Sequence, residues 1–322
     1  MKIMRKHLLI IAVFATTMAS AQADSIAKVK NWKMKVIYGI NGSQTSFVNW
    51  NAGGRNNVAA LGFIDATANY KKGTMKLDND LHLALGAVNY LGKDIPKNQV
   101  FQKTDDRIEV NTNAGKRLKE HYYLSFLGNF RTQSLDGYAF PNDSIAASRF
   151  MAPGYATVAL GIDYSPTDNF TLFVSPLSAK MTFVKSDRLA NLGAFGVDPA
   201  EYDGFGNLII AGKQFRGEFG AYLQMKYKRT IAENVDFKCA LAMFSNYTNN
   251  PGNIDVNAET LFSFKINNWL SSSLQWNLIY DDDIDIQRTV DGVSKNGPVT
   301  QFKSVLGLGI SFSMQNYVDE KK

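Results

Sequence analysis

The chain has 322 residues, of which 35 are basic and 29 acidic, giving a formal net charge of +6 at pH 7. No block of basic residues stands out beyond the N-terminal segment, which argues against nucleic-acid binding. No stretch of about eighteen apolar residues follows that segment, which excludes inner-membrane helices. The single cysteine, Cys239, excludes an internal disulfide.

The first 21 residues have the pattern of a secretory signal peptide. Three basic residues precede an apolar run over 8–15, and a small-residue site ends at Ala21. We expect cleavage after Ala21 and export of residues 22–322 to the bacterial outer membrane. This remainder has 32 basic and 29 acidic residues, so it is nearly balanced. No linker divides it, which predicts a single domain.

From residue 32 onwards, long segments alternate between apolar and polar residues. Over 75–87 the odd positions are mostly leucine, whereas the even positions begin Lys76, Asp78, Asp80 and His82. Successive side chains of a strand point to opposite faces, so each such segment has an apolar and a polar face. The same pattern recurs over 215–227 and 254–266. Strands of this kind are typical of a barrel in lipid.

In chain order, this alternation predicts twelve strands. They span 32–41, 57–70, 74–89, 106–116, 121–133, 155–164, 169–184, 214–228, 235–246, 254–266, 270–281 and 299–314. Short and long connections alternate between them, as do the periplasmic turns and extracellular loops of outer-membrane barrels. The predicted fold class is therefore all-β, a transmembrane antiparallel up-and-down β-barrel, followed by a short tail over 315–322.

Aromatic residues recur on the apolar parity next to the short turns. The set comprises Trp32, Tyr70, Tyr122, Tyr164, Phe170, Tyr227 and Phe312. Aromatic rings of this kind line the membrane–water interface of transmembrane barrels. We interpret the set as an aromatic girdle at the turn end.

The opposite parity carries charges of both signs, and we expect these side chains to line the lumen. The set comprises Asp65, Lys76, Asp78, Asp80, His82, Arg107, Glu109, Arg131, Arg216, Glu218, Lys226, Glu259, Lys265 and Lys303. A mixture of signs suits a salt-bridged interior or a narrow polar conduit and disfavours strong selectivity for one sign of ion.

Two groups within these patterns could carry chemistry. Asp78, Asp80 and His82 share one face of one strand and could activate water as a hydrolytic site, against the alternative of an ion-paired network. Asp281, Asp282, Asp283 and Asp285 could bind Ca²⁺, against the alternative of a solvated acidic loop, because the EF-hand spacing is missing. Neither group predicts a resident cofactor.

Several segments resemble a known family. They include SQTSFVNWNAGG (43–54), KTDDRIEVNTNAGK (103–116), the long segment 150–184, LANLGAFGVDP (189–199), GEFGAYLQMKYKR (217–229) and LIYDDDI (278–284). These are similar to the outer-membrane family of Bacteroidota called domain of unknown function 3078. The resemblance implies an outer-membrane location and a barrel-like fold, and it transfers no activity or catalytic residue. Relative to that family, 200–215 is extended, which suggests a variable outer loop.

The sequence leaves two main functions open. The first is a narrow channel or transporter for small polar solutes. The second is a non-conducting envelope scaffold that binds another envelope protein through its extracellular loops, where Tyr138, Tyr202 and Phe205 are among several aromatic residues. A barrel-embedded hydrolase at Asp78, Asp80 and His82 is a third hypothesis. The expected partners are outer-membrane lipid and the barrel-insertion machinery, with no nucleic acid.

Overall fold

The computed structural model describes residues 31–45, 56–91, 101–138, 144–284, 286–290 and 293–317. The predicted signal segment, the tail beyond 317 and Asp285 lie outside the described residues. Within the described residues, no helix is long and apolar enough to cross a membrane.

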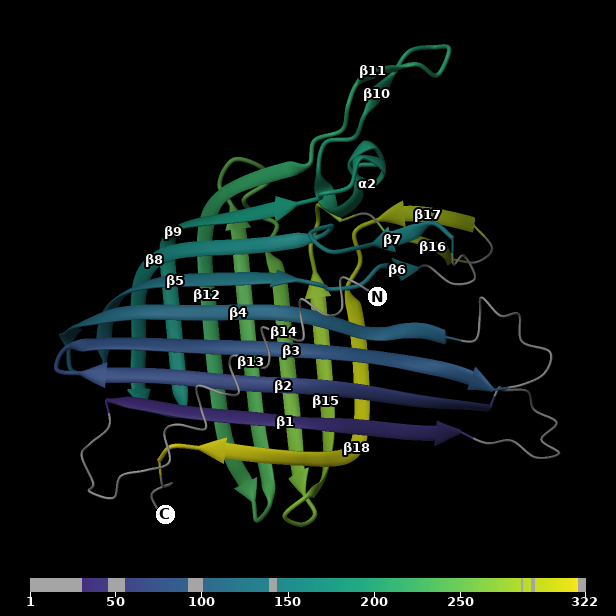
Figure 1. The fold of residues 1–322 in the computed structure, drawn as a ribbon. Helices are drawn as coiled ribbons and strands as arrows, with labels where there is room; N and C mark the ends of the chain where they lie inside the picture. Colours follow the sequence, from purple (N-terminus) through teal and green to yellow (C-terminus); the bar gives the residue numbers. More distant parts are fainter. Residues whose placement is uncertain are drawn as a thin grey trace, which may run out of the picture. The chain divides into compact units, whose positions relative to one another are not determined.

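Twelve antiparallel strands close into one barrel within the unit Trp32–Lys322 (Figure 1). They are β1 (Trp32–Thr45), β2 (Asn56–Lys72), β3 (Met75–Leu91), β4 (Phe101–Lys119), β5 (Tyr122–Thr132), β8 (Gly154–Thr167), β9 (Phe170–Phe183), β12 (Phe215–Ala232), β13 (Val235–Asn246), β14 (Asp255–Lys265), β15 (Leu270–Tyr280) and β18 (Gln301–Gln315). Neighbours in the wall follow one another along the chain, and β1 pairs with β18 to close the ring. The predicted fold class and all twelve strands are confirmed.

Six strands are longer than the alternation alone predicted, whereas β5, β9, β14, β15 and β18 are one or two residues shorter. β4 begins at Phe101 rather than 106, and β12 continues to Ala232 rather than ending at 228. Several residues assigned to short turns, such as Lys71 and Arg117, therefore belong to strands, because four of the five short hairpins turn through only two residues. We call the barrel end with these short hairpins the turn end and the opposite end the loop end.

The long connections at the loop end contain secondary structure that the sequence did not predict. Two short helical segments lie between β9 and β12, and three two-stranded hairpins extend beyond the wall (Figure 1). These elements are β6 (Gly137–Tyr138), β7 (Ala146–Ser148), α2 (Asp187–Asn191), η2 (Ala194–Gly196), β10 (Glu201–Tyr202), β11 (Leu208–Ile210), β16 (Ile286–Val290) and β17 (Val293–Gly297). They are too short for hydrophobic periodicity to show them.

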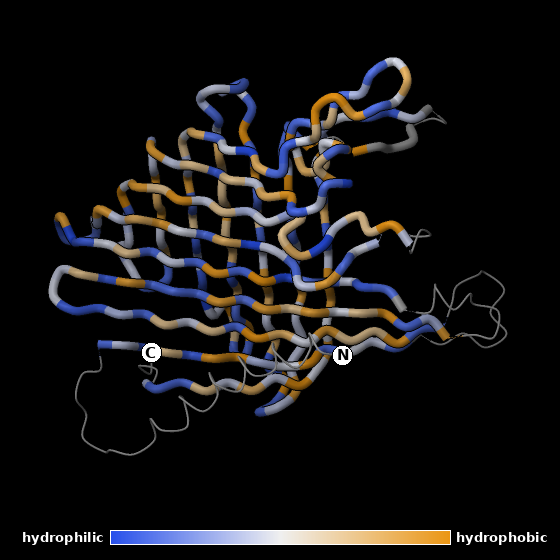
Figure 2. Tube along the Cα trace, turned by 45° about the horizontal axis from the view of Figure 1, so that its top comes forward, coloured by the Kyte–Doolittle hydropathy of each residue, from blue (hydrophilic) through white to orange (hydrophobic). Residues whose placement is uncertain are grey.

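The outer face of the wall is apolar. Apolar and polar residues alternate along the strands (Figure 2), and the exposed large hydrophobic side chains of β18 all share one parity. They are Phe302, Leu306, Leu308, Ile310, Phe312 and Met314. On the paired strand β1, Tyr38 and Ile40 continue this face. An antiparallel barrel with such an exterior has the surface that a bilayer requires of a transmembrane barrel.

The strands approach each other closely at the seam between β1 and β18. A Cβ atom added to Gly309 would lie 2.0 Å from the carbonyl oxygen of Ile40, and one added to Gly39 would lie 2.4 Å from that of Ile310. Real side chains do not tolerate such contacts with backbone, so the seam depends on the missing Cβ atoms. By contrast, a Cβ on Gly42 would lie 3.7 Å from its nearest neighbour.

We therefore expect Gly309→Ala to destabilise the barrel by about 2 kcal/mol, the usual cost of overpacking a tight contact. The matched control Gly42→Ala should leave stability almost unchanged. Urea unfolding of each variant, refolded in detergent and followed by tryptophan fluorescence, measures the difference. Equal midpoints for the two variants would contradict a tightly packed seam.

Candidate functional site

A salt bridge crosses the lumen between opposite walls. Arg107 of β4 donates from Nη2 to Glu259 of β14 over 3.0 Å and from Nε to Glu109 over 2.8 Å. Five strands separate β4 from β14 in either direction around the ring. The side chains of Arg107 and Glu259 can meet only by extending into the interior. Gln275 adds a hydrogen bond to Glu259, 2.7 Å long.

Two further ion pairs join strands that are not neighbours. Lys226 of β12 donates to Asp80 of β3 over 3.2 Å, and Lys303 of β18 donates to Asp105 of β4 over 2.9 Å. In both cases at least three strands lie between the partners. The polar parity therefore faces an enclosed space that its own ion pairs bridge.

The three residues considered for hydrolysis have separate partners. The ring of His82 is hydrogen-bonded to Asp65, its register partner on β2, and to no other group among the described residues. Asp80 pairs with Lys226, and Asp78 lies 3.9 Å from Lys76. The Asp65–His82 pair can fix the tautomer of the imidazole. A hydrolase would also need a nucleophile or an activated water within its reach.

A buried ion pair stands at the turn end. Asp163 of β8 is fully buried and accepts hydrogen bonds from Lys76 over 2.7 Å, from Asn113 over 2.6 Å and from Ser165 over 2.5 Å. The Lys76 ammonium also lies 4.4 Å from the centre of the Tyr123 ring. These partners come from four strands, so sequence spacing alone could not have brought them together.

A second ionic cluster stands at the loop end. Lys180 of β9 donates to Asp255 over 2.5 Å and to Asp281 over 2.9 Å. Arg216 of β12 pairs with Asp283 and also donates to the carbonyl oxygen of Gly196 over 2.9 Å. The cluster ties β9, β12 and β14 to the loops that follow β9 and β15.

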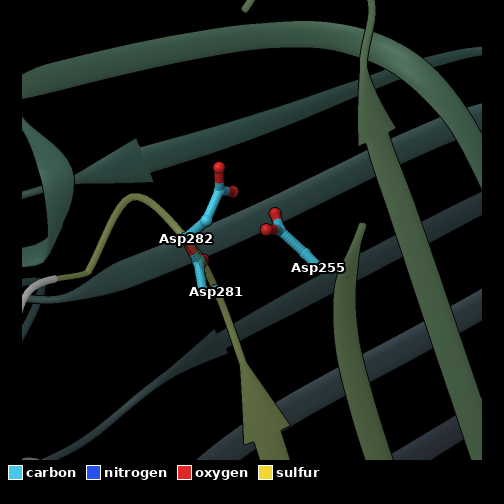
Figure 3. Close-up of side chains that lie close together, drawn as sticks. All are labelled: Asp255, Asp281 and Asp282. Carbon is cyan, nitrogen blue, oxygen red and sulfur yellow. The ribbon is translucent and has the colours of Figure 1, made fainter. Parts of the chain in front are cut away.

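The aspartates considered for Ca²⁺ are divided within this cluster. Oxygen atoms of Asp281 and Asp282 lie within 4.8 Å of each other and of Asp255, which the sequence did not suggest (Figure 3). Asp283 pairs with Arg216 instead, and Asp285 is outside the described residues. The three grouped carboxylates offer hard oxygen ligands. However, the Lys180 ammonium already pairs with Asp255 and Asp281, and the Asn253 side chain donates to Asp282.

Part of the lumen is apolar, which the polar parity did not predict. Leu127, Ala159, Phe173, Tyr222 and Phe244 are buried together on the inner face of the wall from β5 to β13. Phe173 is 1% exposed. The available signal was the presence of large apolar residues, such as Phe173 and Phe244, on a parity otherwise polar or small.

The loops of the loop end have a small core of their own. It contains Ala152, Val184, Leu189, Ala190 and Val197, with Ala194 and Phe195 packed against it. Arg188 donates to the carbonyl oxygen of Ala146, which ties the loop after β9 to the loop after β5. A folded structure therefore stands where the sequence predicted only variable loops.

The hairpin β10–β11 extends from this structure and exposes apolar side chains. Phe205 is 94% exposed at its tip, next to the exposed Tyr202 and Leu208. Asp203 accepts hydrogen bonds from Asn207 and Phe205, and the Asn207 side chain in particular holds the pKa of Asp203 below its ordinary value. This turn presents Phe205 in a defined position.

Three further residues of the predicted lumen remain. The Arg131 guanidinium lies 5.3 Å from the centre of the Tyr155 ring, and Glu218 accepts a hydrogen bond from Arg216 over 3.2 Å. Lys265 is exposed at the turn end.

The residues of the predicted girdle meet in cross-strand pairs. Trp32 and Tyr70 lie 5.1 Å apart between ring centres, and Tyr122 and Tyr164 lie 4.9 Å apart. Phe170 and Tyr227 are register partners, and Phe312 contacts Tyr38 at 5.9 Å. All stand on the outward parity.

These features define the class of protein, a transmembrane up-and-down β-barrel with an ion-paired interior. Residues 43–138 match the family described as Protein of unknown function (DUF3078), which confirms the resemblance over that range. Residues 196–291 match a second family, Protein of unknown function, DUF481. Each match covers under a third of the chain. A search of curated proteins finds no match.

Several solved structures are similar in outline. The COG4313 outer membrane channel from Pseudomonas putida F1 is 10% identical with a TM-score of 0.37, covering 90% of this chain and 100% of that one. The translocator domain of autotransporter NalP from Neisseria meningitidis is 9% identical, TM-score 0.35, covering 95% of each. The outer membrane channel DcaP of Acinetobacter baumannii is 10% identical with a TM-score of 0.29, and the match covers 91% of this chain and 100% of that one.

We expect Asp163→Ala to destabilise the barrel by about 3–5 kcal/mol, because it removes the buried counter-charge that is hydrogen-bonded to the Lys76 ammonium. Asp168→Ala is the matched control, since Asp168 is an exposed carboxylate in the turn of the same hairpin. Its cost should stay within about 0.5 kcal/mol. Urea unfolding in one detergent compares the two variants, and similar losses would show that the ion pair does not stabilise the turn end.

Proposed function

We propose that this protein is a narrow conduit for small polar solutes in the bacterial outer membrane. An N-terminal signal would export it, and the barrel-insertion machinery would place it in outer-membrane lipid. Support comes from the closed wall with an apolar exterior, and from a lumen lined with charged side chains from opposite walls. Polar linings of this kind suit hydrated solutes.

The Arg107–Glu259 bridge carries the proposal, because it sets the width of the conduit. Side chains from opposite walls touch at this level, so a solute must pass beside them or displace them. The apolar group around Phe173 narrows the same interior from one wall. The conduit we propose is therefore constricted and admits small solutes only.

A scaffold remains the second candidate, and a different observation favours it. The loop end has its own packed core, and the hairpin β10–β11 exposes Tyr202, Phe205 and Leu208. Exposed apolar side chains on an ordered loop are typical of surfaces that bind another protein. In this alternative the cross-lumen ion pairs would stabilise a barrel that does not conduct.

Planar-bilayer recordings separate the two candidates. We expect small unitary currents from the wild type, and an increase of about twofold or more from the double variant Arg107→Ala, Glu259→Ala, since the bridge limits the cross-section. Ile108→Ala changes the adjacent, outward-facing residue and should keep the wild-type conductance.

If neither the wild type nor the double variant gives unitary currents at any salt concentration or voltage, the conduit would be rejected in favour of the scaffold. Equal currents from the wild type and the double variant would instead show that the constriction lies elsewhere. Insertion is verified for each protein by its β-sheet circular dichroism in the same vesicles.

A further inference from the structure

The ionic side chains of the interior are sorted by sign along the barrel. At the loop end the carboxylates outnumber the cations, and Lys180, Arg216 and Lys303 have carboxylate partners. The carboxylates are Asp105, Glu218, Asp255, Asp281, Asp282 and Asp283, and the cations are Arg131, Lys180, Arg216 and Lys303. The loop end is therefore the acidic end of the lumen.

The turn end has the opposite balance. Lys228 stands two residues from Lys226, which reaches Asp80 across the lumen, so both share the inward face of β12. Lys238 is the register partner of Lys228. On β14, Lys265 has the same parity as the inward Glu259. All three lysines are exposed, and none joins an ion pair among the described residues.

Asp163 is already bound to Lys76, but Asp78 and Asp236 are further carboxylates on the inward parity at this end. They are fewer than the four inward lysines at positions 71, 228, 238 and 265, so this end keeps an excess of positive charge. Lys71, the register partner of Lys76, adds a further inward ammonium at the same end. Like charges placed opposite each other are unfavourable without a counter-ion, and low-dielectric walls concentrate their field.

We propose that the turn end of the lumen is a binding vestibule for small polyanions, solutes that carry phosphate or several carboxylates. The vestibule is defined by Lys71, Lys228, Lys238 and Lys265. Ammonium groups bind phosphate as point charges, and several at one rim favour a multiply charged anion. The vestibule's role in transport rests on the proposed conduit, whereas the binding itself does not.

The phosphate of lipid headgroups could also bind lysines at the turn end. The strand register shows which lysines face the lipid and which face the lumen, so lipid phosphate and a soluble anion would contact different residues. Lys72 and Lys116 stand at the same end but share the outward parity with Met75, their common register partner. Met75 is 49% exposed on the outer face. Lipid headgroups would contact the outward pair, and a solute in the lumen would contact the vestibule lysines.

Calorimetric titration with inorganic triphosphate tests the proposal on the full barrel in an uncharged detergent. We expect the triple variant Lys228→Gln, Lys238→Gln, Lys265→Gln to bind at least about tenfold more weakly than the wild type, because three of the charges are lost. The control Lys72→Gln, Lys116→Gln should bind within about twofold of the wild type. Added salt should weaken wild-type binding.

Undiminished binding by the triple variant, or an equal loss in the outward control, would overturn the proposal. Binding to vesicles of phosphatidylglycerol forms the second arm. A loss there confined to the outward control supports separate lipid and solute sites, whereas a loss confined to the triple variant assigns the vestibule lysines to lipid. Calorimetric titration does not depend on conductance. If the barrel binds triphosphate but carries no current, the proposed conduit is rejected and the proposed vestibule is not.

Discussion

Backbone hydrogen bonding in lipid is the constraint on which this structure depends. A bilayer offers no partner for an unpaired N–H or C=O group, so a sheet can cross it only as a closed ring. Here the pairing of β1 with β18 closes the ring, and the close approach of Gly39 and Gly309 shapes the seam. Closure then separates two surfaces, an apolar exterior and an ionic interior whose charges do not face the lipid.

Ion pairs across the lumen follow from that enclosure. Arg107 and Glu259 lie 152 positions apart in the chain, yet their side chains touch because a twelve-stranded ring puts β4 opposite β14. Desolvated charges of this kind are costly when single and tolerable when paired. Among the described residues, Arg107, Lys226 and Glu259 have partners in the middle of the interior, and the lysines without an ion pair lie near the turn end, where water can solvate them.

The alternation along each strand was enough to predict the fold, because one face of every strand is turned to the lipid and side chains alternate strictly between the two faces. It also predicted a set of inward residues, among them Lys76, Arg107 and Glu259. It could not identify their partners, since the contact between Lys76 and Asp163 depends on which strands face each other. Nor could it reveal the apolar group around Phe173 or the packed loop core, because both arise from tertiary packing rather than from periodicity.

The seam has a consequence for biogenesis. The two strands that close the wall are the first and the last of the twelve, so the most non-local pairing in the sheet is also the one that removes its edges. Until β18 has reached β1, both carry unsatisfied backbone groups that can template association with another chain. Assembly must therefore protect the unpaired edges of β1 and β18 from other chains until the barrel has closed.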